Sequence, residues 1–297
     1  LFVMSSFTEK LSAEAVAFFN MVCQKPFAEQ AVHFLNAYWH EIGNQAEFIF
    51  SIGWDWAKKT DMKAKNIQYV HQYEEGNEFD LNFGLYFYEQ LCRFLEDEKN
   101  AQWVDKKYSI SQPEMMTAIK RKQELREKVD VNFDGRVSFL EYLLYQYRDF
   151  ANPADFCVRS MSAPDEHPEI RKARLALQEV NKRIQEYEAE KQRLTEEAEL
   201  PGVKGLAAKN LLAQLESSPQ ADRLREALIK AEAAVRIASK KFGGGKVLAP
   251  GEVRAEGEAG RTELPTDGAI WWMNRDLEEK KKRYGPKNPK SPRADKS

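Results

Sequence analysis

The sequence predicts an all-α protein. Apolar residues recur at helical spacing along most of the chain, and capping residues, prolines and glycines stand at the ends of these segments. Two long seams in the second half alternate three- and four-residue steps, which is typical of paired helices. We therefore expect a helical N-terminal region, then a helical hairpin with coiled-coil character, and a separate C-terminal helix.

Composition excludes several classes of function. The chain carries 45 basic and 47 acidic residues, so its net charge of −2 favours neither nucleic acid nor a membrane surface. No apolar run approaches the roughly 18 residues that indicate a spanning helix. Three cysteines without a C-x-x-C pair indicate reduced thiols. We expect a cytoplasmic protein with no membrane span and no nucleic-acid partner.

The N-terminal segments begin and end at clear helix signals. Residues 12–23 form an amphipathic run that Ser12 opens and Pro26 closes, and "FAEQAVHFLNAYWHEI" ends at Gly43. Asn44 and Glu47 are spaced as a capping box for the next helix. The apolar residues in 48–56 fit both a strand and a helix, and we expect a deeply buried helix there.

The most informative stretch is "DVNFDGRVSFLE", residues 130–141. A hard dication such as Ca²⁺ takes about six to eight oxygen ligands, which a loop of this length supplies from alternate positions if it turns sharply at its sixth residue, here Gly135. We therefore predict a calcium-binding EF-hand. Its ligands would be side-chain oxygens of Asp130, Asn132 and Asp134, the carbonyl oxygen of Arg136, Ser138 through water, and both carboxylate oxygens of Glu141.

Helices are expected on both sides of this loop. In "SQPEMMTAIKRKQELREK" the signals are Ser111 as N-cap, Pro113 in the first turn and Glu114 completing a capping box. The exiting helix follows from residue 139 and ends before Asn152-Pro153. The predicted buried faces contain Met116, Ile119 and Leu125 in the entering helix, and Phe139, Leu140, Leu143, Leu144 and Tyr147 in the exiting helix.

A second hand is expected because Val137 would sit in a short backbone bridge that needs a partner. The best candidate is "EFDLNFGLYFYE", residues 78–89, where Leu85 would match Val137. Phe83 occupies the turn position and Gly84 follows one residue late, so we expect a degenerate hand that binds calcium weakly or not at all. Its possible ligands are Glu78, Asp80, Asn82 and Glu89.

Catalytic motifs are absent from the sequence. The four histidines form no close cluster, and "GGGKV" at Gly243 lacks the flanking residues of a phosphate-binding loop. No nucleophile motif or dinucleotide fingerprint occurs. We expect a protein that is not an enzyme.

Residues 165–242 read as an antiparallel helical hairpin, although dimerisation through the same seams is an alternative. A shorter helical piece, "LAAKNLLAQLESSP", lies between the two long helices. The second long helix carries more basic than acidic residues, a strip that either meets an acidic partner or is merely solvated. The seams contain Ile170, Ala173, Leu177, Val180, Ile184, Tyr187, Lys191, Leu194 and Ala198, and then Leu224, Leu228, Ala231, Val235, Ala238 and Phe242.

The C-terminal part begins with a stretch rich in Gly, Glu and Pro, residues 243–268, which reads as a flexible linker. A basic amphipathic helix and tail follow over 269–297, with Asp267 as a cap and Gly285-Pro286 as the stop. The helix either docks on its own chain or detaches to bind a partner groove. Its apolar side contains Ile270, Trp271, Met273, Leu277 and Tyr284.

Several longer stretches point to a family. The segments "SFTEKLSAEA", "LYFYEQLCRFLED", "KRKQELREKVDVNFDGRVSFLEYLLYQYRDFANPADFC" and "IWWMNRDLEEKKKRYGP" resemble the calcium-regulated actin-bundling protein of amoeboid cells. The resemblance implies a cytoskeletal protein that cross-links actin filaments into parallel bundles and loses this activity when calcium rises. It also implies that residues 130–141 form the working hand.

Bundling by one chain requires two filament contacts. We expect the main contact on the hairpin and a weaker one on the N-terminal unit, with calcium reorienting the helices beside the loop. The alternative is a calcium-sensor adaptor that captures a partner helix and does not bind actin.

The predicted parts are a helical unit with the degenerate hand (1–110), the hand (111–160), the hairpin (165–242), the linker and the terminal helix. The candidate actin contacts are Lys182, Arg183, Arg223, Arg225, Lys230, Arg236, Lys240 and Lys241.

Overall fold

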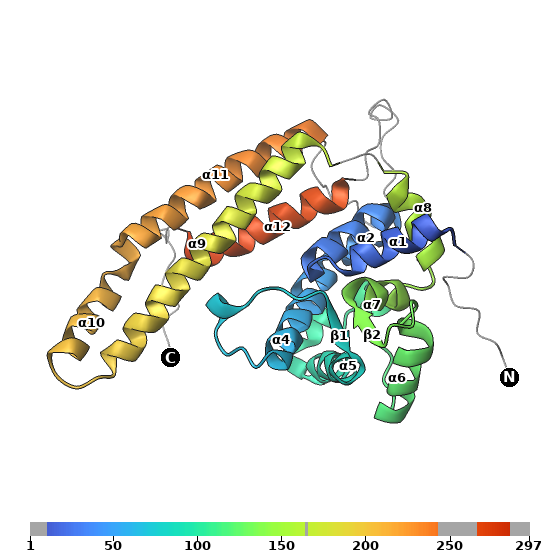
Figure 1. Ribbon diagram of the computed structural model, residues 1–297, viewed down its shortest axis with the longest axis horizontal. Coiled ribbons are helices and arrows are strands. Elements are labelled where there is room, and N and C mark those ends of the chain that lie inside the picture. The colour runs from blue at the N-terminus through green and yellow to red at the C-terminus, as the bar shows by residue number, and fades with distance from the viewer. Residues whose placement is uncertain (1–10, 164–165, 243–265, 286–297) are drawn as a thin grey trace. The chain divides into compact units, whose positions relative to one another are not determined.

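The computed structural model describes residues 11–163, 166–242 and 266–285 (Figure 1). The described chain is helical apart from one two-stranded sheet, so the predicted all-α class is confirmed. It divides into two compact units. Unit 1 comprises residues 1–69, 73–165 and 242–272, and unit 2 comprises residues 70–72, 166–241 and 273–297.

Unit 1 is a helical bundle around an aromatic core. Phe27 lies centrally, with its ring centroid 5.0 Å from that of Phe79 and 6.0 Å from that of Phe139. The described parts of the predicted segments 1–110 and 111–160 therefore share one core. The helices are α1 (Ala13–Cys23), α2 (Phe27–Ile42), α3 (Ala46–Phe48), α4 (Asp55–Ala64), α5 (Leu81–Glu96), α6 (Ala118–Glu124), α7 (Phe139–Gln146) and α8 (Pro153–Met161).

The first helices follow the predicted signals with one exception. Ser12 caps α1 by accepting a hydrogen bond from the backbone N–H of Ala15, and residues 46–64 form the predicted buried helix. The stretch Ile49–Trp54 is π-helical, and this wider turn brings apolar residues inward that an α-helix would spread around its surface. The capping box is wrong, because Asn44 lies in a 3₁₀ turn and Glu47 accepts from the Ser51 hydroxyl.

A short sheet joins the two halves of unit 1. Strands β1 (Glu78–Asp80) and β2 (Arg136–Ser138) pair antiparallel, with Phe79 opposite Val137. The predicted backbone bridge at Val137 is therefore present. Its predicted partner is wrong, because Leu85 lies in α5.

Unit 2 contains the predicted hairpin. Helices α9 (Pro168–Ala198) and α11 (Pro219–Phe242) are long, and α10 (Val203–Ala213) lies between them in the chain. They run antiparallel, since Lys241 near the end of α11 pairs with Glu169 at the start of α9 at 3.5 Å (Figure 1). The seam residues that are buried are Ile170, Ala173, Leu177, Val180, Ile184 and Leu194, and then Leu224, Leu228, Ala231, Val235 and Ala238.

Helix α12 (Asp267–Tyr284) contributes to both units. In unit 1, Asn36 of α2 accepts a hydrogen bond from the backbone N–H of Ala269, and Trp272 packs 4.9 Å from Phe50 between ring centroids. From Met273 onward, α12 packs in unit 2, where Asn274 donates to the Ser239 hydroxyl. The C-terminal helix is thus docked on its own chain, the first of the two predicted alternatives.

Three further expectations concern the linker and tail, a membrane span and the cysteines. Residues 243–265 of the predicted linker and residues 286–297 of the tail lie outside the described residues, whereas Asp267 and Gly268 already belong to α12. Of the helices in the described ranges, none has the length and apolar character needed to cross a membrane. Cys23 and Cys157 are buried free thiols, and Cys92 is half-buried.

Candidate calcium site and basic surfaces

The loop from Asp130 to Glu141 folds around its own acidic side chains. Asp130 accepts backbone N–H bonds from Asp134 at 3.2 Å and from Gly135 at 2.9 Å, and Asp134 accepts one from Arg136 at 2.8 Å. Gly135 has φ 79°, the left-handed conformation that a glycine adopts without steric cost. The predicted sharp turn at the sixth position is therefore present.

Glu141 closes the loop from the first turn of α7. One carboxylate oxygen accepts from the backbone N–H of Val131 at 3.0 Å, and the other from the N–H of Ser138 at 2.8 Å. Ser138 in return caps α7 by accepting from the N–H of Glu141. Glu141 is only 2% exposed, and this burial, with the nearby charges of Asp130 and Asp134, raises its pKa to about 8.

The chemistry of the loop fits calcium. Burial also raises the pKa of Asp130, and the charge of Asp134 adds to this effect, so the loop gathers negative charge that a cation would stabilise. In the parts of the chain that the structure describes, no three His, Cys, Asp or Glu side chains form a ready-made ligand cluster. The loop oxygens instead accept backbone N–H bonds, including those from Val131 and Ser138 to Glu141.

The first hand differs from its predicted register. Phe79 pairs with Val137, which occupies the eighth position of its loop, so the equivalent loop of the first hand runs over residues 72–83. Its twelfth position is Phe83, which has no oxygen in its side chain. The loop predicted over 78–89 is wrong, because α5 begins at Leu81.

The four oxygen-bearing residues predicted there do not form a set of metal ligands. Glu78 forms an ion pair with Arg136 across the sheet, and Asp80 caps α5 by accepting from the N–H groups of Asn82 and Phe83. Asn82 and Glu89 stand nearly two turns apart on α5, about 10 Å along its axis. These side chains therefore do not converge on one point.

The entering helix is shorter than predicted. It begins at Ala118 with Thr117 as the cap, while Ser111 is buried and donates to the side-chain oxygen of Gln45 at 2.6 Å. The predicted N-cap at Ser111 is wrong because this tertiary bond uses its hydroxyl. Leu125 is buried as predicted, but Ile119 is 84% exposed, so its assignment to the buried face is also wrong.

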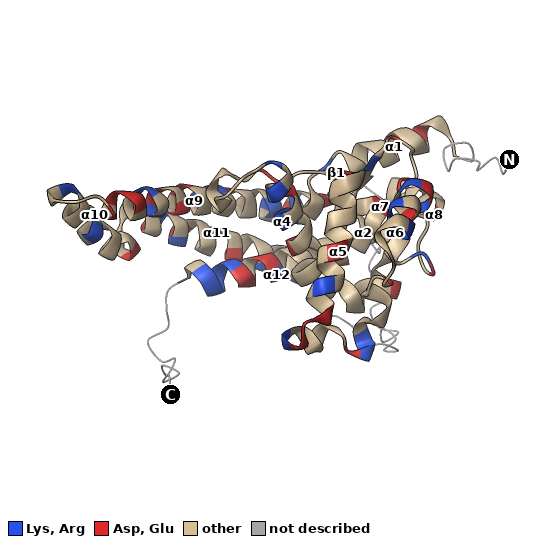
Figure 2. Cartoon of the chain, turned by 90° about the horizontal axis from the view of Figure 1, so that it is seen from below, with Lys and Arg blue, Asp and Glu red and all other residues tan. Residues whose placement is uncertain are grey.

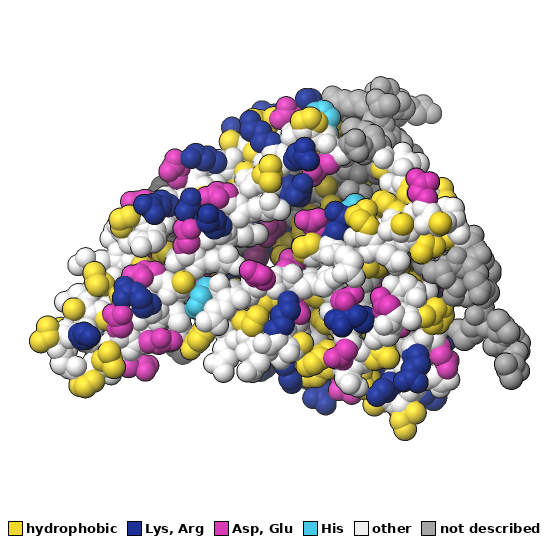
Figure 3. Space-filling model, viewed as in Figure 1, with side chains coloured by type: hydrophobic (Ala, Val, Ile, Leu, Met, Phe, Trp, Pro, Cys, Tyr) yellow, Lys and Arg dark blue, Asp and Glu magenta, His cyan; other side chains and the backbone are white. Residues whose placement is uncertain are grey.

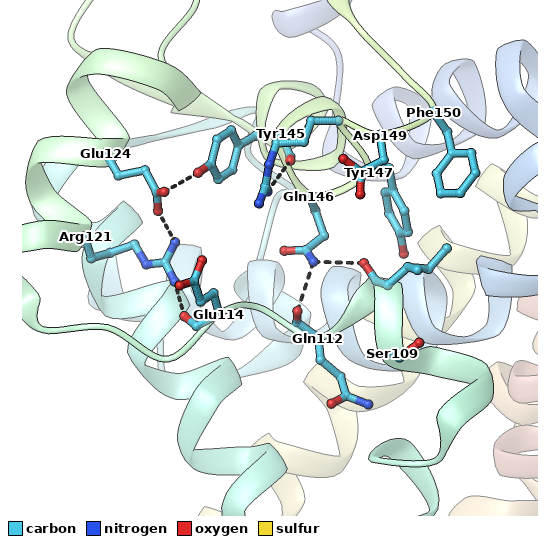
Figure 4. Close-up of a pocket in the computed structure, with 12 residues that line it drawn as sticks. Ser109, Gln112, Glu114, Arg121, Glu124, Tyr145, Gln146, Tyr147, Asp149 and Phe150 are labelled. Atoms are coloured by element: carbon cyan, nitrogen blue, oxygen red, sulfur yellow. Dashed lines mark hydrogen bonds and ion pairs between the residues drawn. The ribbon is translucent and has the colours of Figure 1, made fainter.

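A polar network joins the entering and exiting helices, and sequence reasoning missed it. Glu124 of α6 accepts from the Arg121 guanidinium and from the Tyr145 hydroxyl of α7 (Figure 4). Arg121 also donates to the carbonyl of Glu114 and lies 4.2 Å above the Tyr88 ring. The network borders a cavity of about 290 Å³. The feature of the sequence that could have indicated this network is the spacing of Arg121 and Glu124, which share a helical face with Leu125.

The basic residues of the hairpin are only partly neutralised. Arg225 pairs with Asp222, Lys230 with Glu226, Lys241 with Glu169, and Arg183 with Glu179 and Glu186. Figure 2 shows basic and acidic residues interspersed along the hairpin, and Figure 3 shows their side chains mixed on its surface. Within residues 166–242 and the other described ranges, no ion pair includes Lys182, Arg223, Arg236 or Lys240. Among the eight predicted actin contacts, these four side chains therefore keep the positive charge that is most available to a partner.

The fold and the site together define a class of protein, in which a helical unit with an EF-hand-type loop is followed by a helical hairpin. Residues 137–264 match the family described as F actin bundling C terminal. The chain is 65% identical over 281 residues to the calcium-regulated actin-bundling protein of Dictyostelium discoideum, covering 95% of this chain and 92% of that protein. The chain belongs to the family of calcium-regulated actin-bundling proteins.

A solved structure agrees with this assignment. The crystal structure of the 34 kDa F-actin bundling protein from Dictyostelium discoideum matches with a TM-score of 0.84 at 64% identity. The match covers 93% of this chain and all of the solved one. Both relatives are named for actin bundling, which is not a catalytic activity, and neither name supports the adaptor alternative.

Proposed function

We propose that this chain binds the sides of actin filaments, cross-links them into bundles, and loses the bundling activity when calcium occupies the loop from Asp130 to Glu141. The single observation that carries this proposal is the 65% identity to a calcium-regulated actin-bundling protein over 95% of the chain. The cytoskeleton of the cytoplasm is the location that such a function requires.

The main filament contact in this proposal is the outer face of the hairpin. Actin filaments are acidic, so cations without an acidic partner of their own bind them most strongly. Lys182, Arg223, Arg236 and Lys240 meet this condition, whereas Arg183, Arg225, Lys230 and Lys241 are partly neutralised. Ile229 and Ile237, which are 67% and 48% exposed on α11, add apolar area beside these cations.

Calcium acts in this proposal through Glu141. The ion takes the carboxylate oxygens that now accept from Val131 and Ser138. Moving this carboxylate pulls the first turn of α7 toward the loop and changes the angle between α6 and α7. The six predicted ligands supply a coordination sphere of oxygen atoms, which is the type that Ca²⁺ prefers.

Cosedimentation with actin filaments tests this function. In a calcium chelator, the chain should pellet with filaments at high speed, where single filaments sediment, and at low speed, where only bundles sediment. Calcium at micromolar concentration should abolish low-speed pelleting. Absence of pelleting at both speeds would contradict the proposal and favour a calcium-sensor adaptor.

A further inference from the structure

Bundling requires a second filament contact, and unit 1 offers a surface suited to it. Helix α6 continues through the π-helical turn Leu125–Val129, so that residues 118–129 form one helical segment before the calcium loop. Its inner side is buried at Arg121, Glu124, Leu125 and Val129. The outer side carries a face that we call the α6 face, formed by Ile119, Lys120, Lys122, Gln123 and Arg126.

Four of the five residues of the α6 face lie on one stripe of the helix, and the fifth, Lys120, follows Ile119 in the chain. Ile119, Lys122, Gln123 and Arg126 follow the spacing i, i+3, i+4, i+7, which places them on one stripe of a helix. All of them are exposed. Figure 3 shows basic side chains gathered over this part of unit 1, with apolar side chains at its edge.

The charge of the α6 face is available to a partner. In the described ranges, no carboxylate forms an ion pair with Lys120, Lys122 or Arg126, and Lys122 contacts only the neutral side chain of Asn82 at 3.3 Å. Glu127, which follows Arg126 in the chain, accepts hydrogen bonds from Gln123 at 3.0 and 3.1 Å. By comparison, Lys59 and Lys65 elsewhere in unit 1 pair with carboxylates of their own helix.

An apolar side chain stands among these cations. Ile119 is 84% exposed, and Met115 just before the helix is 59% exposed. A large apolar side chain left in water costs free energy that burial in an interface recovers. A surface with an apolar anchor between unpaired cations fits an acidic protein surface that also offers apolar area.

We propose that the α6 face is the second filament contact, the one that turns side binding into bundling. This inference rests on the proposed function, because the partner it names is the acidic actin filament. The face is small, so its contact is weak alone and becomes effective once the hairpin has fixed the chain to a first filament. Because α6 leads directly into the calcium loop, reorienting α6 removes this contact without touching the hairpin.

The test separates the two contacts by centrifugal speed. The variant carries Lys120→Glu, Lys122→Glu and Arg126→Glu, and a matched control carries Lys59→Glu, Lys99→Glu and Lys106→Glu, also at exposed positions of unit 1. In chelator, the α6-face variant should keep high-speed pelleting within about twofold of wild type and need at least about fivefold more protein for low-speed pelleting. The control should bundle like wild type.

A second variant tests the apolar anchor. Ile119→Ser removes an exposed side chain, so it should leave the fold intact and weaken low-speed pelleting alone. Unchanged low-speed pelleting of the triple variant would overturn the α6 face, and so would an equal loss in the control or a loss of high-speed pelleting. If wild type itself fails to pellet, the proposed function fails, which is a separate outcome. Circular dichroism confirms that each variant is folded.

Discussion

The Tyr145 hydroxyl of α7 donates a hydrogen bond to the carboxylate of Glu124 in α6. This contact ties the exiting helix of the calcium loop to the entering helix, and Arg121 strengthens it by pairing with the same carboxylate. Both helices must change their relative angle if calcium draws Glu141 into the loop. In the proposed mechanism, the bond therefore stabilises the present angle between the two helices and opposes calcium binding.

Removing this bond should raise calcium affinity. A hydrogen bond to a charged group contributes about 1.5–3 kcal/mol, so Tyr145→Phe should tighten calcium binding by about tenfold to a hundredfold if most of this energy is lost in the calcium-bound form. Calorimetric titration measures the change. Tyr142→Phe, on the same helix but outside the network, serves as the control and should bind calcium like wild type. Equal affinities for wild type and Tyr145→Phe would show that the bond survives calcium binding.

The structure predicts one calcium ion per chain. The first hand places Phe83 at the position where a bidentate carboxylate is needed, so of the two hands we expect only the loop from Asp130 to Glu141 to supply a full set of ligands. Glu89→Gln should leave both stoichiometry and affinity unchanged, whereas Glu141→Gln should weaken binding at least about a hundredfold, because a bidentate ligand is lost. Two ions per wild-type chain would contradict this account of the first hand.

The unpaired cations of the hairpin should dominate filament binding. We predict that Arg223→Gln, Arg236→Gln and Lys240→Gln together weaken high-speed pelleting by about fivefold or more at low salt, with a smaller effect at high salt, where charges are screened. The matched set consists of Arg183→Gln, Arg225→Gln and Lys230→Gln, whose side chains pair with carboxylates. Similar losses for both sets would mean that ion pairing within the chain does not decide which cations contact actin.

The start of α12 should not tolerate a side chain at residue 268. A Cβ atom on Gly268 would lie 2.7 Å from the backbone nitrogen of Asn36 and from the Cβ of Leu35, so Gly268→Ala must push α12 away from α2. We expect a loss of about 1–3 kcal/mol in the free energy of unfolding, measured by denaturant titration. Gly84→Ala is the control, since its Cβ would make ordinary contacts at 3.7 Å. A Gly268→Ala chain as stable as the control would mean that the contact between α12 and α2 has space for a methyl group.

The predictions that succeeded came from local patterns. Most seam positions of α9 and α11 were predicted correctly because helical periodicity is repeated over many residues, whereas Tyr187, Lys191, Ala198 and Phe242 are not buried. The turn of the loop at Gly135 was also predicted correctly, because it depends on positions fixed along the sequence. Burial of Leu125 and of the apolar face of α7 followed from the same periodicity.

The predictions that failed depend on tertiary contacts. The register of the first hand is set by the pairing of Phe79 with Val137, and acidic residues on a helix such as α5 can imitate ligand spacing. Ser111 has the composition of a helix cap, but its bond to Gln45 connects residues 66 positions apart. The network around Glu124 joins two helices, so no single segment of the sequence displays it.

The central claim is that calcium reverses bundling through the loop from Asp130 to Glu141. Light scattering from actin filaments mixed with this chain tests it most directly, because scattering reports bundles during a calcium titration. Wild type should scatter strongly in chelator and lose this signal as calcium rises, while the double variant Asp130→Ala, Glu141→Gln should keep it throughout. A wild-type signal that ignores calcium, or a double variant that responds like wild type, would contradict the account.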